Sequence, residues 1–208
     1  MIQKEIYWSR FADDFEERNN YVIGKADLDA MLAKLSKLKE LKNVLELGCG
    51  NGTYSRIIAK NADQLLATDF SDEMANASEV RLKSISNITV EKANCFNLPY
   101  ADNSFDTIFM ANLLHIIPQP EKAISEAKRV LKKDGAIIII SYTSEGMKFH
   151  NILKMICRYM KTYGKPSPFA QKIKLTDAQN MLVKKDFKIT EASLIGSKMK
   201  AIFVTAQK

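Results

Sequence analysis

The chain has 208 residues, a formal net charge of +7 and three cysteines. This length suffices for one folded domain, and no apolar run approaches the length of a transmembrane helix. The first residues lack the apolar core of a signal peptide, so we expect a cytoplasmic protein without integral membrane association. The cysteines (Cys49, Cys95 and Cys157) lie far apart and only two histidines are present, so reduced thiols and no metal site are expected.

The positive charge is concentrated toward the C-terminus. From Met147 onward the sequence holds 13 Lys and Arg against 3 Asp and Glu, whereas the remainder holds 18 against 21. Such a region could attract nucleic acid, an anionic lipid surface or an acidic small molecule. It is equally explained by lysines that solvate the outer faces of the last elements. Nucleic acid is not favoured, because Lys and Arg do not alternate with aromatic residues.

The first 42 residues are expected to form a helical cap. Aromatic residues stand among charges in residues 1–24, which predicts a helix or flap over a ligand, or a strut on the core. Apolar residues then recur on one helical face after Asp27, a candidate N-cap. The two sets are Tyr7, Trp8, Phe11, Phe15 and Tyr21, then Leu28, Met31, Leu32, Leu35 and Leu38.

The segment Asn43–Tyr54 reads N-V-L-E-L-G-C-G-N-G-T-Y. A short apolar strand runs directly into Gly48, Gly50 and Gly52, and a helical pattern starts at Thr53. Glycine permits sharp turns and close approach of the backbone to a ligand, and a helix start favours anionic or polar ligand groups. The dinucleotide fingerprint G-x-G-x-x-G needs one more residue before its third glycine, so an NAD-dependent oxidoreductase fits poorly.

A second short strand, Gln64–Thr68, ends at Asp69, 21 positions after Gly48. A doubly wound fold places a carboxylate there for the hydroxyls of a ribose, although a turn or helix-cap aspartate is the alternative. Ser71 is the expected cap of the next helix.

Three further strands are predicted, at 88–93, 105–111 and 136–141. The second of these is expected to continue to residue 117, where Pro118 stops it. A helix begins near Pro120, and Gly135 is expected to end it in a left-handed conformation. The strand at 136–141 is strongly hydrophobic, as in parallel sheets covered on both faces.

The tail is expected to contain a basic amphipathic helix over 148–163, within a lid-like insertion at 145–175. An ordinary packing helix is the alternative. Thr176 is expected to cap a further helix, and strands at 187–194 and 201–206 must form an antiparallel hairpin because no crossover helix separates them. The predicted fold is a single α/β domain, a doubly wound seven-stranded, mostly parallel sheet with helices on both faces.

The motif E-L-G-C-G-N-G-T resembles the first motif of class I S-adenosylmethionine-dependent methyltransferases. The stretches A-N-C-F-N-L-P-Y, F-D-T-I-F-M-A-N-L-L-H and A-K-R-V-L-K-K-D-G-A resemble the small-molecule branch that includes ubiquinone and menaquinone biosynthesis enzymes. The resemblance is clearest over residues 43–142, the expected cofactor-binding core, and looser in the C-terminal helix and hairpin at 176–208.

The resemblance implies S-adenosylmethionine as cofactor and S-adenosylhomocysteine as product. Glu46 would order the ammonium group, the glycine loop would line the methionine part, and Asp69 would hold the ribose. The family commonly has aspartate at the position of Asn94, so the contact of Asn94 with adenine lacks that charge. The full implied set is Glu46, Gly48, Cys49, Gly50, Asp69, Phe70, Met74, Asn94, Cys95, Asn112 and Leu113.

A base is needed only if the acceptor arrives protonated. His115 is the candidate, with a buried structural histidine as the alternative; Tyr7, Tyr21 and Tyr142 are weaker candidates. The sequence lacks the N/D-P-P-Y and Pro-Cys motifs of enzymes that methylate nucleobase or glutamine nitrogen and cytosine C5. The favoured function is methyl transfer to a small molecule; RNA or protein methylation and a non-catalytic cofactor-binding regulator are the alternatives.

Overall fold

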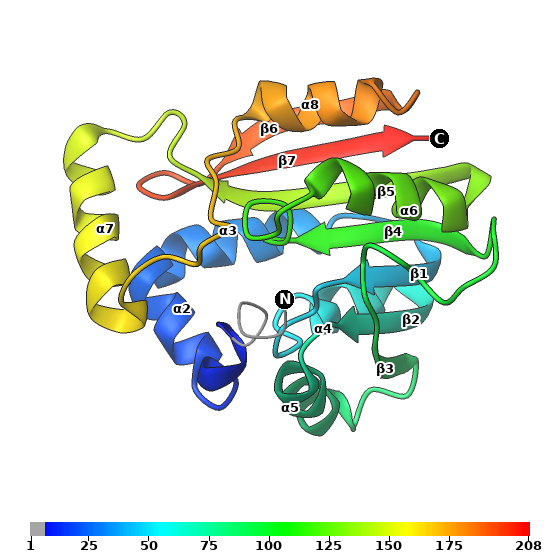
Figure 1. Cartoon of the computed structure of the whole chain (residues 1–208), viewed down its shortest axis with the longest axis horizontal. Coiled ribbons are helices and arrows are strands. Elements are labelled where there is room, and N and C mark those ends of the chain that lie inside the picture. The colour runs from blue at the N-terminus through cyan, green and yellow to red at the C-terminus, as the bar shows by residue number, and fades with distance from the viewer. Residues whose placement is uncertain (1–6) are drawn as a thin grey trace.

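The computed structural model describes residues 7–208. Their strands form one seven-stranded sheet, and helices pack around it (Figure 1). The strand order is β3-β2-β1-β4-β5-β7-β6. Strands β1 to β5 pair in parallel, whereas β7 runs antiparallel to both β5 and β6. The predicted doubly wound sheet and its C-terminal hairpin are therefore confirmed. The strands are β1 (Lys42–Leu47), β2 (Ala62–Asp69), β3 (Ile88–Lys92), β4 (Phe105–Ala111), β5 (Leu131–Thr143), β6 (Lys188–Ile195) and β7 (Lys200–Gln207).

Helices cover both faces of the sheet, as predicted. They are α2 (Phe15–Ile23), α3 (Lys25–Leu35), α4 (Ser55–Ile58), α5 (Asp72–Leu82), α6 (Pro120–Val130), α7 (Phe149–Tyr163) and α8 (Leu175–Val183), with short 3₁₀ turns η1 (Ser9–Phe11) and η2 (Ala59–Asn61). Within residues 7–208 no helix combines the length and apolarity needed to span a bilayer.

Alternating side chains of the central strands divide the core into two layers. On β5, Ile137 and Ile139 pack with α6 and α8, whereas Ile138 and Ile140 face the layer that contains α3. All four are buried. Strands covered on both faces have no solvent-facing side, which explains the continuous isoleucine run.

Gly135 does not end α6. The helix stops at Val130 and the chain passes directly into β5, because the amides of Asn103 and Ser104 bond the last helical carbonyls, those of Arg129 and Val130, at 3.1 and 2.8 Å. Gly135 lies inside β5, where a Cβ atom would be 2.8 Å from the carbonyl oxygen of Asp106. The glycine thus permits close approach of neighbouring backbone and has no left-handed capping role.

Strand β4 ends at Ala111, six residues earlier than predicted. Asn112 turns the chain with a positive φ of 55°, a conformation that asparagine tolerates. Its amide still donates to the carbonyl of Ile140 at 2.7 Å. The apolar residues that follow therefore form a loop at the strand end.

Thr176 does not cap α8, which begins one residue earlier, at Leu175. The first orphan amides of this helix have acidic partners. The amide of Lys174 donates to the carboxylate of Asp177 at 2.9 Å, and the amide of Leu175 donates to Glu145 at 2.7 Å. A hydroxyl cap is unnecessary with these two carboxylates in place.

Asp27 is likewise not an N-cap, since Gly24 takes that position of α3. Its buried carboxylate instead binds the turn between β6 and β7. It accepts hydrogen bonds from the amides of Ser197, Lys198 and Met199 at 2.6, 3.2 and 2.8 Å, and from the Ser197 hydroxyl at 2.9 Å. Burial alone would raise the pKa of Asp27, but these bonds outweigh it and lower the pKa. The contribution to stability is therefore present above the ordinary aspartate pKa and is lost as the pH falls through the lowered value.

Replacing Asp27 by asparagine is expected to lower the free energy of unfolding by about 1 to 3 kcal/mol, because a charged acceptor of buried amides is lost. Urea unfolding at pH 7 measures this. Asp29→Asn on the same helix is the control, since Asp29 only pairs with the exposed Lys25. Equal losses in the two variants would contradict the assigned role of Asp27.

Candidate cofactor site

The candidate site lies where the parallel strands end. The carboxyl ends of β1, β2 and β4 point toward the same side of the molecule, and α2 and α7 stand beyond them (Figure 1). Open α/β sheets bind ligands at this edge. Loops from all three strand ends supply the side chains described below.

The glycine loop follows β1 with three left-handed residues. Gly48, Gly50 and Gly52 have φ angles of 74°, 55° and 79°. A Cβ at Gly48 would lie 2.8 Å from Leu113, and one at Gly52 would lie 2.8 Å from Leu82. Among residues 7–208, a Cβ at Gly50 would meet only the Phe15 ring, at 4.0 Å. The outer glycines are thus required by packing, whereas the middle one leaves space for a ligand.

Asp69 lies at the tip of β2 and faces this loop. One carboxylate oxygen accepts from the amide of Gly50 at 2.9 Å and the other accepts from the amide of Ser71 at 2.9 Å. Burial raises the pKa of Asp69, although the backbone hydrogen bonds oppose that shift. Asp69 therefore joins the glycine loop to the start of α5, where the predicted Ser71 cap accepts from Met74 at 3.1 Å.

Glu46 is the least satisfied polar side chain of the site. It is fully buried on β1, and neither carboxylate oxygen has a hydrogen-bond partner among the residues that the structure describes. Burial raises the pKa of Glu46 to about 7. The nearby Ser55 hydroxyl lowers the pKa of Glu46, although it makes no hydrogen bond of normal geometry within residues 7–208. The negative charge of Asp69 raises the pKa further. A buried unpaired carboxylate is costly, so this site favours a positively charged group.

The residues predicted to surround an adenine ring differ in accessibility. Met74 is buried and Phe70 is exposed. The side-chain oxygen of Asn94 accepts from the amide of Phe96 at 2.9 Å, so its acceptor is already engaged. Cys95 lies close by, with a pKa raised to about 12, mainly by burial. Cys49 lies within the glycine loop and is buried as well.

A polar network that no local sequence pattern predicts lies at the end of β4. Asn112 donates to the hydroxyl of Tyr54 at 3.0 Å and accepts from the amide of Tyr142 at 3.0 Å. The two tyrosine hydroxyls lie 2.9 Å apart, and Asn19 donates to Tyr142 at 3.0 Å. Burial raises the pKa of both Tyr54 and Tyr142, so neither is a ready base. The only sequence signal for this network is that Tyr54, Asn112 and Tyr142 each lie near the end of a predicted strand. These residues are far apart in sequence, so the signal does not show that they meet.

His115 lies beside this network. Its Nδ1 is 2.7 Å from the hydroxyl oxygen of Ser141, and its ring centre is 6.4 Å from that of Tyr142. Burial lowers the pKa of His115 to about 4. The imidazole is therefore neutral at pH 7 and is a weak base.

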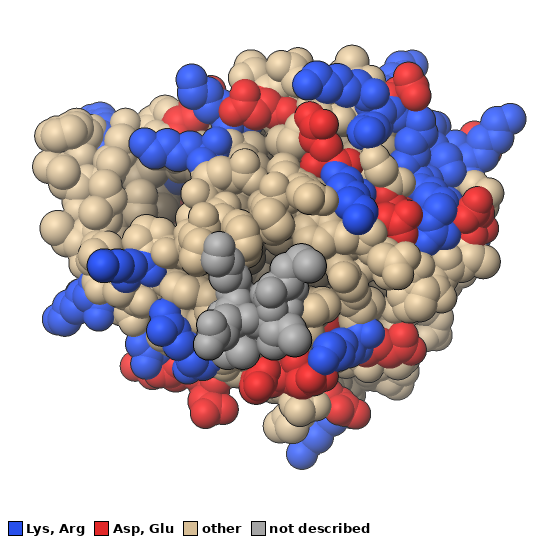
Figure 2. All heavy atoms as spheres, viewed as in Figure 1, with Lys and Arg blue, Asp and Glu red and all other residues tan. Residues whose placement is uncertain are grey.

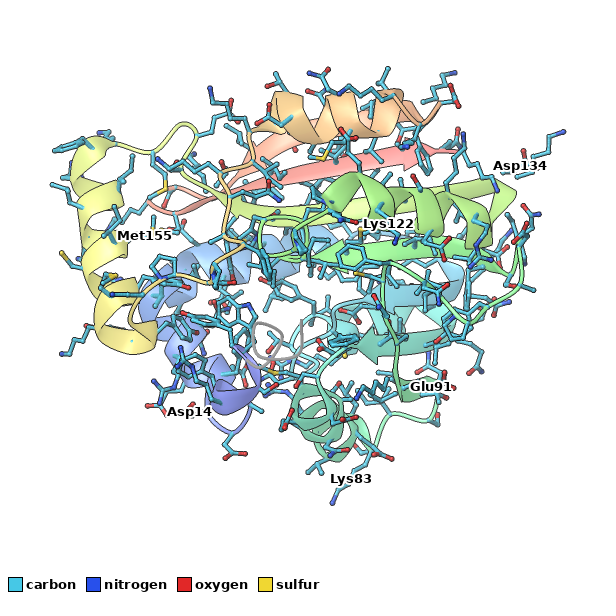
Figure 3. All side chains as sticks on the ribbon, in the orientation of Figure 1. Asp14, Lys83, Glu91, Lys122, Asp134 and Met155 are labelled. Atoms are coloured by element: carbon cyan, nitrogen blue, oxygen red, sulfur yellow. The ribbon has the colours of Figure 1, made fainter. Side chains whose placement is uncertain are left out.

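The N-terminal segment joins the glycine loop to α7. The Ser9 and Ser71 hydroxyls lie 2.6 Å apart, and the Phe15 ring faces Gly50. Tyr7 donates to the carbonyl of Lys165 at 2.8 Å. Aromatic rings of this segment also stack edge-on against α7, and Figure 3 shows Met155 of α7 directed toward the body of the protein.

The sheet order, the glycine loop and Asp69 define a class I methyltransferase fold. Residues 45–139 match the family model described as a methyltransferase domain. A demethylmenaquinone methyltransferase of Clavibacter sepedonicus is 31% identical over 103 residues, which cover 50% of this chain and 42% of that protein. The ubiquinone/menaquinone biosynthesis C-methyltransferase UbiE of Rickettsia prowazekii is 30% identical over 148 residues, covering 65% and 59%.

The chain thus spans about half the length of these curated relatives. A solved SAM-dependent methyltransferase from Aquifex aeolicus superposes with a TM-score of 0.71 at 22% identity, covering 96% of this chain and 97% of that one. By its central sequence and its fold, the chain resembles the class I S-adenosylmethionine-dependent methyltransferases, among them those of quinone biosynthesis.

Proposed function

We propose that the chain transfers a methyl group from S-adenosylmethionine to a small-molecule acceptor. The observation that carries this proposal is the buried carboxylate of Glu46, which has no partner among residues 7–208 and stands on the strand that leads into the glycine loop, where only Phe15 of these residues lies near Gly50. An ammonium group would supply the missing positive charge. The match to a methyltransferase domain and the names of the relatives support the same activity.

The residues present fit the cofactor. Glu46 would hold its ammonium group, the backbone at Gly48 and Gly50 would line its methionine part, and Asp69 would accept from its ribose hydroxyls. When bound, S-adenosylmethionine supplies a methyl group that is already electrophilic. The protein then has to hold the acceptor in line and exclude water. Met74 and Phe70 would lie against the adenine ring.

The acceptor would meet the polar network at the end of β4. Asn112 is fixed by Tyr54 and Tyr142, so the loop that carries Leu113 and His115 is held in place. His115 would accept a proton only from an acceptor atom that carries an acidic one, because its own pKa is about 4. Aromatic rings from the N-terminal segment contact α7 beside this network, and a small molecule is the acceptor class that we propose there.

Replacing Asp69 by asparagine is expected to weaken S-adenosylhomocysteine binding roughly tenfold or more, because a charged acceptor becomes neutral. Isothermal calorimetry at pH 7.5 measures this. The 2′-deoxy analogue separates two roles of Asp69. If Asp69 contacts the ribose, the variant loses less affinity for the analogue than for the parent compound. Equal losses would assign Asp69 to holding Gly50 alone.

The acceptor class is tested by incubating the wild-type protein with radiolabelled S-adenosylmethionine and either a cell metabolite fraction, total RNA or a protein fraction. Label in the metabolite fraction supports the proposal. Label in RNA or protein supports the macromolecular alternative. Tight cofactor binding without any labelled product supports a non-catalytic regulator.

A further inference from the structure

Helix α7 carries an uncovered apolar stripe. Phe149 is 74% exposed, and Leu153, Ile156 and Met160 are 46–47% exposed. These residues recur at three- and four-residue spacing and so form one row along the helix. The neighbouring, inward side of the helix holds Met155, Tyr159 and Tyr163, which pack into the core. The stripe is thus additional to the face that attaches α7 to the domain.

The charges of α7 are all positive. The helix contains no Asp or Glu, and Lys154 and Lys161 are exposed beside the stripe, followed by Arg158 around the helix surface. In the space-filling view, the flank formed by α7 is largely uncharged, with Lys and Arg at its borders (Figure 2). A row of large apolar side chains next to Lys and Arg is the pattern of a helix that lies in a membrane interface.

We propose that the outer face of α7 docks the protein on an anionic lipid surface. Phe149, Leu153, Ile156 and Met160 would enter the boundary between headgroups and acyl chains, while Lys154 and Lys161 would contact lipid phosphates. With 15 residues, α7 is too short to span a bilayer and lies along its surface.

The position of α7 gives this docking a consequence. Its inner residues Tyr159 and Tyr163 meet Tyr7 and Trp8 of the N-terminal segment, which reaches Ser71 beside Asp69. Docking would hold this side of the cofactor site against the lipid surface, where an apolar acceptor dissolves. The inference goes beyond the proposed methyl transfer, because lipid binding requires no cofactor.

Lipid is favoured over two other occupants. A second copy of the chain would bring an equally basic α7 against this one, and the like charges would repel. RNA would account for the lysines but not for four exposed Phe, Leu, Ile and Met side chains. An anionic lipid surface satisfies both the apolar stripe and the charge.

The test is co-sedimentation with vesicles of phosphatidylglycerol and phosphatidylcholine in equal amounts, compared with phosphatidylcholine alone. We expect the wild-type chain to prefer the anionic vesicles about tenfold or more, with binding that weakens as salt is raised. The Leu153→Glu/Ile156→Glu variant should lose about tenfold or more of its binding. Val80→Glu/Val183→Glu, at apolar sites on α5 and α8 that are 69% and 56% exposed, should keep it.

Charge is tested separately. Lys154→Glu/Lys161→Glu should lose the preference for anionic vesicles, whereas Lys83→Glu/Lys133→Glu, with the same change in net charge, should retain most of it. Calorimetry with S-adenosylhomocysteine shows that each variant is folded, and it reports on the proposed function independently. The inference is overturned if both vesicle types bind equally, or if the stripe variant binds like the wild type. It is also overturned if ultracentrifugation shows a dimer that only the stripe variant breaks, or if RNA is retained in place of lipid.

Discussion

Glu46→Gln is expected to weaken S-adenosylhomocysteine binding about a hundredfold, because a buried charge pair with the ligand's ammonium group is replaced by a neutral amide. Glu46 has no hydrogen-bond partner within the described chain, so nothing else satisfies its charge. Calorimetry at pH 8 measures the loss. Glu79→Gln, on the exposed surface of α5, is the matched control and should bind like the wild type.

The same residue gives a pH dependence with a defined sign. The pKa of Glu46 is about 7 in the folded chain and about 4.5 in the unfolded chain. Between these values the folded chain binds more protons, so the wild-type protein without ligand loses stability as the pH rises from about 4.5 to 7. The shift corresponds to about 3 kcal/mol. Glu46→Gln should lack this decrease in urea unfolding.

Ligand binding should offset the free-energy cost of ionising Glu46 in its buried position. Pairing with an ammonium group favours ionised Glu46, so binding near pH 6.5 should release protons, which calorimetry in two buffers of different ionisation enthalpy detects. The variant should release none from this site. Proton release that is identical in wild type and variant would contradict the assignment of Glu46 to the ammonium group, even if affinity fell for another reason.

Gly50→Asn is expected to abolish measurable S-adenosylhomocysteine binding, a loss of about a thousandfold or more, by filling the space that the cofactor needs. Asparagine tolerates the left-handed conformation at φ 55°, as Asn103 and Asn112 show in this chain. Within the described part of the chain, the nearest atom to a new Cβ is 4.0 Å away on Phe15, so these residues accommodate the side chain. The thermal midpoint should therefore change little.

Two neighbouring substitutions separate packing from ligand space. Gly52→Asn would place its Cβ 2.8 Å from Leu82 and should unfold at a lower temperature. Gly146→Asn, at another left-handed glycine outside the loop, should retain binding with at most a small loss of stability, because its Cβ would lie 3.3 Å from the Leu194 side chain. Full affinity in a folded Gly50→Asn protein would show that the ligand does not approach this loop.

Much of the fold follows from short-range sequence signals. The sequence predicts all seven strands. The inner strands are apolar runs bounded by turn residues, and the edge strand β3 shows alternating apolar and polar residues. The hairpin of β6 and β7 is predictable because no helix separates the two strands. Ser71 is recognisable as a cap from its place before two acidic residues. These features depend on residues that are neighbours in sequence.

The errors arise where distant residues satisfy the backbone. Asp27 looks like a helix cap, but its partners are Ser197 to Met199 near the other end of the chain. The end of α6 needs no glycine because residues 103 and 104 supply amides. Likewise, the network of Asn19, Tyr54, Asn112 and Tyr142 is assembled from α2, β5 and two loops, so no local sequence pattern predicts it. At α7 the apolar pattern is correct, but only the structure shows that part of it faces outward.

The contact between Asp27 and the β6–β7 turn bears on how the chain is synthesised. Strand β7 (residues 200–207) lies between β5 and β6, so the sheet acquires its final order only when these residues are available. During translation, α3 leaves the ribosome long before the amides that its carboxylate binds. The Asp27 carboxylate stays in water until the β6–β7 hairpin has been made. Pairings between segments that are distant in sequence slow folding. The order in which the segments are made therefore delays the contact of Asp27 with the β6–β7 turn.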